Sequence, residues 1–218
     1  RLDKLEAEAD ETGGSVSFLL GNHEPMVLSN DLRYTDEKYK TLADTLGIEY
    51  ASLFGPDTEL GRWLGTRNTI QVIGTNLFVH AGAGQAFYEL NPDIPLVNRE
   101  TSRMLFRRNK TRKAWSPLHA FLYGSEGPLW YRGLVREKPK YKPCAADTLQ
   151  MILNRYGVER IIVGHTVQPD ISAFYDGRVI GVNVNNRKNR EQGLGRGLLI
   201  EQGACYVVGD KGKLRQLF

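Results

Sequence analysis

Three short segments of this 218-residue chain contain residues that could bind a metal ion or take part in acid–base chemistry. In each of them an apolar run ends in histidine or asparagine beside glycine: residues 18–24, 77–82 and 161–166. A neutral imidazole binds divalent transition metals, and an amide oxygen adds a harder ligand. Glycine next to such a ligand lets the backbone approach a metal ion or a phosphate without a Cβ clash. These segments contain three of the four histidines of the chain, which indicates a metal or phosphate site.

The apolar runs before these side chains predict buried strands. In layered α/β folds, ligands gather at the carboxyl ends of strands, where side chains from different strands converge. A single histidine at a strand end is more often a structural residue, and a Gly-His-Thr triplet is common by chance. The occurrence of all three segments in one chain favours the functional interpretation.

With these residues the chain resembles the calcineurin-like metallophosphoesterases, and within them the phosphoprotein phosphatase branch, in particular the Shewanella-like phosphatases. The matching motifs follow the order of the family and span most of the chain: Gly21-Asn22-His23-Glu24, Val79-His80-Ala81-Gly82, Gly127-Pro128-Leu129-Trp130-Tyr131-Arg132-Gly133 and Gly164-His165-Thr166-Val167-Gln168. The first motif is fairly specific, and the Trp-Tyr-Arg-Gly run favours the phosphatase branch. The resemblance implies a metal-dependent phosphatase that hydrolyses phosphate monoesters of phosphoproteins, at Ser/Thr or Tyr.

The resemblance also implies a role for each matching residue. Asn22, His80 and His165 would be ligands of one metal in a centre of two divalent ions, for which manganese, iron and zinc are all suitable. Two such ions can bridge a hydroxide, lower its pKa and neutralise the phosphoryl oxygens. His23 would be the general acid for the leaving-group oxygen. Arg132 would bind the phosphate oxygens through the fork of its guanidinium.

Three neighbouring residues have less specific assignments. Glu24 would orient the His23 ring through a ring N–H, as carboxylates around functional histidines commonly do. Trp130 and Tyr131 would bind substrate by shaping the cleft beside Arg132, and a role for both as core anchors is equally open.

Two motifs that precede these in the family do not occur in the sequence, namely Gly-Asp-x-His-Gly and Gly-Asp-x-x-Asp-Arg-Gly. In the family they supply the ligands of the other metal, the bridging aspartate and a second phosphate-binding arginine. The chain also starts at Arg1, inside a predicted helix. We therefore expect an N-terminally truncated protein that by itself binds metal weakly and has little or no phosphatase activity.

Helical patterns between the early strands and a run of late strands predict a mixed α/β sandwich in a single domain, residues 1–218. The resemblance implies the layered αββα sandwich of the metallophosphoesterases. Predicted helices cover residues 2–9, 37–46, 58–64, 96–108 and 144–156; predicted strands cover residues 15–20, 68–73, 76–80, 160–163, 171–174, 179–184, 197–201 and 204–208. Residues 110–142 contain several prolines and glycines and predict a long surface loop.

The charge distribution suggests a competing function. The net charge is +4, and residues 99–113 contain seven basic residues and one acidic residue. Such a patch could attract a phosphorylated substrate or nucleic acid, or form a solvated helix face. Phe106 and Trp115 are the sole aromatic residues in or beside it, which disfavours a single-strand nucleic-acid module.

The same motifs are also compatible with a phosphodiesterase or a nucleotide-polyphosphate hydrolase, because substrate choice in such a scaffold lies in the loops. A catalytically inactive homologue that serves as a binding scaffold would keep them as well. No stretch approaches the roughly 18 consecutive apolar residues of a membrane-spanning helix, so we expect no membrane partner. Cys144 and Cys205 are too few for a disulfide framework.

Overall fold

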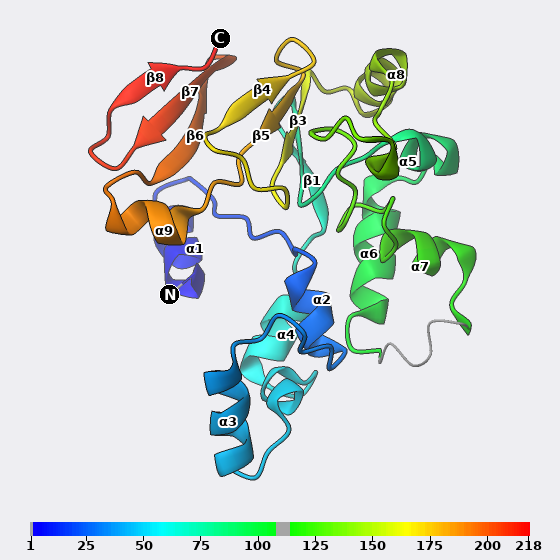
Figure 1. Cartoon of the computed structure of the whole chain (residues 1–218), viewed down its shortest axis with the longest axis vertical. Coiled ribbons are helices and arrows are strands. Elements are labelled where there is room, and N and C mark those ends of the chain that lie inside the picture. The colour runs from blue at the N-terminus through cyan, green and yellow to red at the C-terminus, as the bar shows by residue number, and fades with distance from the viewer. Residues whose placement is uncertain (1, 108–113) are drawn as a thin grey trace.

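The structure is a computed structural model that describes residues 2–107 and 114–218 (Figure 1). The helices are α1 (Leu2–Glu11), α2 (His23–Leu28), α3 (Glu37–Thr45), α4 (Glu59–Gly65), α5 (Gln85–Leu90), α6 (Ile94–Met104), α7 (Pro117–Leu122), α8 (Ala146–Tyr156) and α9 (Asn186–Glu191), with short 3-10 helices η1 (Tyr50–Phe54) and η3 (Pro139–Tyr141). The strands are β1 (Ile70–Ile73), β2 (Asn76–Val79), β3 (Arg160–Val163), β4 (Ser172–Phe174), β5 (Val179–Gly181), β6 (Arg196–Glu201), β7 (Ala204–Gly209) and β8 (Leu214–Gln216).

The larger sheet has the strand order β1-β2-β3-β5-β4. β1 and β2, which match two predicted strands, form an antiparallel hairpin, whereas β2, β3 and β5 run parallel, and β4 returns antiparallel to β5. Parallel neighbours need a long crossover connection, and helices α5 to α8 lie between β2 and β3 along the chain. As a result, the carboxyl ends of β2, β3 and β5 lie at the same edge of this sheet.

The central strands are apolar on both faces because each face of the larger sheet is covered. Leu77, Val79 and Ile161 pack into the main core with the helices, whereas Phe78 and Ile162 pack toward the smaller sheet. Successive side chains of a strand point to opposite faces, which produces this alternation. Helices α5 to α8 contribute buried residues to the main core: Phe87, Val97, Met104, Leu122, Leu149, Ile152 and Leu153. The mixed α/β class with two layered sheets, predicted from the sequence, is confirmed.

The smaller sheet consists of β6, β7 and β8, all antiparallel. Cys205 and Val207 of β7 pack against Ile180 of β5 in a second core between the sheets. β6 and β7 agree with the predicted strands. β8 and α9 were not predicted, because both are short and neither has the apolar pattern of a buried element.

A third cluster holds α2 and α4 beneath the edge of the larger sheet, with Leu20, Leu28, Leu64 and Leu105 all buried. The side chain of Thr58 begins α4 by accepting a hydrogen bond from Gly61 N–H at 3.0 Å, as N-cap threonines do. Helices α3 and α4 and η1 extend from the body here (Figure 1).

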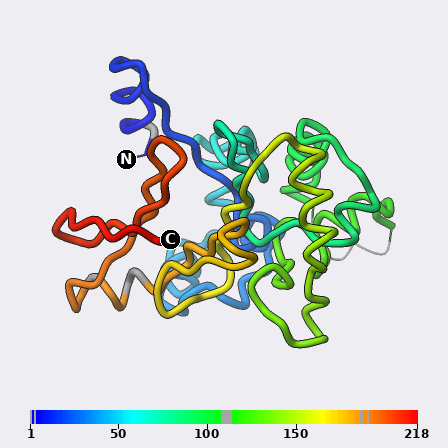
Figure 2. Tube along the Cα trace, turned by 90° about the horizontal axis from the view of Figure 1, so that it is seen from above, coloured from blue at the N-terminus to red at the C-terminus, as the bar shows by residue number. Residues whose placement is uncertain are grey.

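Helix α1 lies at the periphery, where an extended segment joins it to α2 (Figure 2). Most of its described residues are exposed. Glu6 of α1 forms an ion pair of 2.6 Å with Arg67. Arg67 lies in the segment between α4 and β1. Every helix in residues 2–107 and 114–218 is too short or too polar to traverse a lipid bilayer.

The prediction of a strand over residues 15–20 is wrong. Leu19 makes one isolated parallel bridge with Asn68, and Leu20 N–H donates to Asn68 O at 2.9 Å. Residues 11–15 before it are exposed. The apolar residues of this segment pack against α4 rather than into a ladder, and Phe18 contacts Trp63 with ring centroids 5.1 Å apart.

The prediction of a surface loop over residues 110–142 is also wrong for its described part, residues 114–142. Leu122, Leu129, Tyr131 and Leu134 lie in the main core, and α7 and η3 interrupt the loop. Prolines that suggested irregular structure instead stand at the first positions of these two helices, where their missing N–H costs nothing. Residues 110–113 lie outside the described residues.

Helix α6 begins and ends earlier than the predicted helix over residues 96–108. Asp93 begins it by accepting a hydrogen bond from Leu96 N–H at 2.6 Å, with Pro95 in the first turn. The helix ends at Met104, and Arg108 lies outside the described residues.

Candidate active site

Two predicted site histidines follow neighbouring parallel strands. β2 and β3 pair with Val79 opposite Val163, so His80 and His165 emerge at the same edge of the sheet. Beyond the ladder, Gly164 N–H donates to His80 O at 2.8 Å. This bond holds the two loops together and brings both imidazoles into one place.

Asn22 reaches the same place from a segment far away in sequence. The bridge between Leu19 and Asn68 sets the path of the chain, and Asn22 then precedes the first residue of α2. Its side chain is buried, with the residue only 4% exposed. The Asn22 amide therefore lies inside the protein rather than in solvent.

The three side chains meet through one atom each. Asn22 Oδ1 lies 2.8 Å from His80 Nε2 and 3.1 Å from His165 Nδ1, and the two ring nitrogens are 3.1 Å apart. The three contacts of this triangle cannot all be hydrogen bonds. The amide oxygen can only accept a hydrogen bond, and each neutral imidazole ring carries a single proton to donate. The other ring nitrogen of His165, Nε2, is buried and has no hydrogen-bond partner in the described part of the chain.

Both imidazoles are kept neutral at physiological pH. Burial lowers the pKa of His80 to about 4, and the charges of His23 and Arg132 add to the effect. Burial likewise lowers the pKa of His165 to about 3, with Arg132 as the next cause. Metal binding requires an unprotonated imidazole nitrogen, so these rings are in the state that a ligand needs.

The geometry of the triangle fits a divalent metal. Ligand atoms about 2.1 Å from one ion and about 90° apart lie about 3.0 Å from one another, close to the three observed separations. Two imidazoles and an amide oxygen suit manganese, iron or zinc. No group of three or more His, Cys, Asp or Glu side chains that could hold a metal gathers anywhere in the described residues. The triangle itself offers one amide oxygen and two neutral imidazoles, so its donor set is uncharged, which favours weak binding.

Gly21 and Glu24 support the His80 ring. A Cβ on Gly21 would lie 2.8 Å from His80 Cε1 and 2.9 Å from Nδ1, so the ring fills the space that glycine leaves. Glu24 Oε2 accepts a hydrogen bond from Gly21 N–H at 2.7 Å. The carboxylate of Glu24 thus holds the backbone beside His80, and its predicted orientation of the His23 ring stays a prediction.

His165 is one of seven non-glycine residues in the described part of the chain that have a positive φ. Its φ of 54° lies in the left-handed region, which is unfavourable for a non-glycine residue and persists where the surroundings impose it, often at functional sites. The turn buries Thr166, and Thr166 Oγ1 accepts a hydrogen bond from Arg132 Nη1 at 3.1 Å. One turn therefore positions both a predicted metal ligand and the predicted phosphate-binding arginine.

His23, the predicted general acid, occupies the first position of α2 and is exposed. Its ring stacks on Tyr34 at a centroid distance of 5.3 Å and an interplanar angle of 9°. His23 directly follows Asn22 in the chain, and it is one of the electrostatic causes that lower the pKa values of His80 and His165. Tyr34 lies in an irregular segment without a motif, so sequence reasoning missed it.

The two aromatic residues before Arg132 differ in position. Trp130 is partly exposed and its ring stands edge-on to His165, with centroids 5.6 Å apart. Tyr131 is 3% exposed in the main core, and its hydroxyl donates to Lys142 O at 2.6 Å. Its ring also fills the space beside Gly84, where an added Cβ would clash with it. Tyr131 therefore lies where a core anchor would shape the Arg132 loop, and its contact with substrate stays a prediction.

A cleft of about 440 Å³ opens beside this centre. Trp130 and Arg132 line it from one side, and Met26, Asp31 and Arg33 line it from the segment around α2. Arg33 makes two hydrogen bonds of 2.8 Å with Asp31. The cleft thus joins the predicted phosphate-binding residue to a surface that could accept the rest of a substrate.

The basic segment predicted as a competing site is partly neutralised. Arg99 and Arg103 form ion pairs with buried Glu100 at 3.3 and 3.2 Å. His119, the fourth histidine of the chain, lies 3.0 Å from the same carboxylate. The segment's remaining basic residues include four, from 108 to 113, that lie outside the described residues.

Comparison with known proteins supports the resemblance. The family model for calcineurin-like phosphoesterases matches residues 2–169. Shewanella-like protein phosphatase 2 of Arabidopsis thaliana is 26% identical, over 88% of this chain and 59% of the relative. Shewanella-like protein phosphatase 1 of Plasmodium berghei is also 26% identical, over 77% of this chain and 46% of the relative.

Solved structures agree with the sequence relatives. The crystal structure of a cold-active protein-tyrosine phosphatase from a psychrophilic Shewanella species superposes with a TM-score of 0.88 and 31% identity, covering 98% of this chain and 62% of that one. The chain thus spans about half to three fifths of the length of these relatives. The family predicted from the four motifs is confirmed: this chain belongs to the calcineurin-like phosphoesterases.

Proposed function

We propose that this chain is part of a divalent-metal-dependent phosphatase that hydrolyses phosphate monoesters, with phosphoproteins at Ser/Thr or Tyr as substrates. The observation that carries the proposal is the triangle of Asn22 Oδ1, His80 Nε2 and His165 Nδ1, whose sides are 2.8 to 3.1 Å. Family membership supports phosphoester chemistry. The relatives' descriptions as protein phosphatases support the choice of substrate.

Asn22, His80 and His165 would hold one ion of a centre that, in this family, generally contains two divalent metals. Such a centre supplies a water of lowered pKa and positive charge for the phosphoryl oxygens. The ligands expected for the second ion belong to motifs that do not occur in these 218 residues. The residues of this chain therefore account for one metal position, and the 218 residues alone should bind metal weakly and turn over slowly.

The remaining roles fall to side chains around the triangle. Arg132 binds phosphate oxygens through its guanidinium, which Thr166 orients through the 3.1 Å hydrogen bond. His23 donates a proton to the leaving-group oxygen and is aligned by its stacking on Tyr34. Trp130 forms the wall between the centre and the cleft.

Metal binding is the direct test of the proposal. After treatment with a chelator, the chain should bind one manganese ion, as counted by electron paramagnetic resonance of the free ion. His80→Ala should weaken binding at least about 100-fold, because even the loss of an outer-sphere partner costs about 10- to 100-fold. His119→Gln is the matched control and should bind as the wild type does. Equal affinity in His80→Ala would show that the triangle is not a metal site.

The substrate class is tested by the residual turnover of the chain at saturating manganese. A phosphotyrosine or phosphoserine peptide should react faster than bis-p-nitrophenyl phosphate or a dinucleoside polyphosphate. A preference for either of the last two compounds would move the assignment to a phosphodiesterase or polyphosphate hydrolase.

A further inference from the structure

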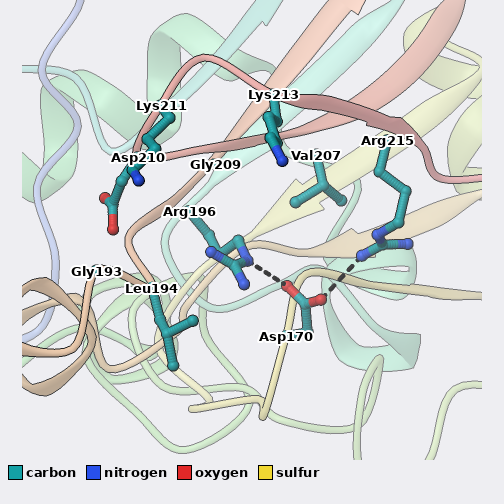
Figure 3. A pocket seen from close by; sticks show the side chains of 10 residues that line it. All are labelled: Asp170, Gly193, Leu194, Arg196, Val207, Gly209, Asp210, Lys211, Lys213 and Arg215. Carbon is teal, nitrogen blue, oxygen red and sulfur yellow. Dashed lines mark hydrogen bonds and ion pairs between the residues drawn. The ribbon is translucent and has the colours of Figure 1, made fainter.

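A second polar pocket lies on the smaller sheet, away from the residues of the candidate active site. It has a volume of about 280 Å³ and is lined by the end of the loop after β3, the start of β6 and the hairpin between β7 and β8 (Figure 3). None of its lining residues belongs to the metal triangle or the cleft beside it. The family motifs do not include it either, so its charge needs a separate explanation.

The pocket has an excess of positive charge. Arg196, Lys211, Lys213 and Arg215 line it, against two carboxylates. One of these, Asp210, accepts a hydrogen bond from the backbone N–H of a neighbouring loop at 2.7 Å. In the described part of the chain, the two lysines have no carboxylate within ion-pair distance. Positive charge gathered in a concave surface attracts anions.

The other carboxylate organises the pocket. Asp170 Oδ2 lies 2.8 Å from Arg215 Nη2, and Asp170 Oδ1 lies 3.4 Å from Arg196 Nε. One aspartate therefore holds two guanidinium groups beside each other. The Nε and Nη1 groups of Arg215 take no part in this pair. In Figure 3 the ammonium of Lys213 points toward the space between the two guanidinium groups.

We propose that this pocket binds a phosphate group, either as inorganic phosphate or as a phosphate monoester. A guanidinium offers a planar fork of donors that matches phosphate oxygens, and an ammonium adds a mobile point charge. Arg215 and Lys213 are the principal contacts, while Asp170 holds the two arginines beside each other and competes with the anion for them. The proposal is independent of the proposed phosphatase activity, because no residue of the candidate active site takes part.

Titration of the isotope-labelled chain with inorganic phosphate, followed by the backbone amide resonances of residues 193, 195, 209 and 212, tests the proposal. These amides should shift and saturate with a Kd of about 1 mM, the range of a weak single-site ligand. Phosphoserine in a parallel titration distinguishes the source: binding of both means that the phosphate group suffices, and binding of phosphoserine alone means that the monoester is required.

A charge-reversal variant provides the control for specificity. Lys213→Glu should weaken binding at least about fivefold at these amides, whereas Lys38→Glu, the same change on exposed α3, should leave it unaltered. Lys213 is exposed, so unchanged resonances in the main core verify that the variant is folded. Absence of saturable shifts with either ligand, or equal affinity in Lys213→Glu, would overturn the proposal. Binding at Arg132 is read separately from the Gly133 amide.

Discussion

The two polar clusters of this chain are built on opposite principles. The triangle of Asn22, His80 and His165 is uncharged and partly buried, with Asn22 buried and both histidines half-buried. The pocket around Asp170 is open and positively charged: Asp170 pairs with the pocket's two arginines, and the pocket's two lysines have no carboxylate within ion-pair distance in the described part of the chain. Burying an unpaired charge is costly, whereas exposed ion pairs contribute little either way. A partly buried site for a cation can therefore be built from neutral ligand atoms at low cost. A site for an anion can use charged side chains at the surface.

The clusters should also differ in their tolerance of change. The triangle depends on close backbone packing, because each ligand atom must stay within a few tenths of an ångström of its place. The pocket depends on flexible side chains, which adapt to altered neighbours. Three substitutions, from the largest expected effect to the smallest, test this contrast.

Gly21→Ala should weaken manganese binding at least about tenfold, within the range of losses that follow when support for a metal ligand is removed. The added Cβ would lie 2.8 Å from the His80 ring and 3.1 Å from Glu24 Oε2, so the ring must shift. Calorimetric or resonance titration with manganese measures the effect. Gly14→Ala is the matched control, because its Cβ would meet atoms no closer than 3.5 Å. Unchanged affinity in Gly21→Ala would mean that the ring position is not critical.

Thr166→Val should weaken phosphate binding at Arg132 about three- to tenfold, the effect of one hydrogen bond. Valine has nearly the same shape but cannot accept the 3.1 Å hydrogen bond from Arg132 Nη1. Thr166→Ser keeps the acceptor and should restore the affinity, as read from the Gly133 amide during phosphate titration. Manganese affinity should remain as in the wild type; a joint loss of both affinities would indicate general distortion of the His165 turn.

Asp170→Asn should strengthen phosphate binding in the surface pocket about two- to threefold, because the anion no longer competes with a carboxylate for Arg196 and Arg215. The free energy of unfolding in urea should fall by no more than about 1 kcal/mol, the value of exposed ion pairs. Asp176→Asn, at an aspartate that is 99% exposed, controls for the change of net charge. Weaker phosphate binding in Asp170→Asn would show that alignment of the arginines outweighs competition.

The elements nearest the site were the most predictable from sequence. The runs before His80 and His165 predicted β2 and β3, because a strand buried on both faces must be apolar without interruption. Residues 15–20 have a similar composition but form a single bridge, since a ladder needs a partner strand and composition does not provide one. The stretch from residue 114 to 142 was predicted as a surface loop because of its prolines, although Pro117 and Pro139 stand at the starts of α7 and η3.

The features of the candidate site were likewise only partly predictable from the sequence. The motifs identified which side chains could coordinate, protonate or bind phosphate. They did not show that Glu24 bonds to Gly21, that Tyr131 is buried, or that Thr166 contacts Arg132. These contacts join segments by side-chain packing, which has no signature at a fixed spacing along the chain.

From the sequence alone, the family and the candidate ligands follow, because chemistry restricts the residue types beside a metal or a phosphate and those types stand in short motifs. Only the tertiary structure brings Asn22 within 3.1 Å of a histidine 143 positions away. It also forms a basic pocket from Asp170, Arg196 and Arg215, which no local pattern connects. The physical reason is that parallel strand pairing and sheet-on-sheet packing determine which distant residues meet, and both depend on the whole chain at once.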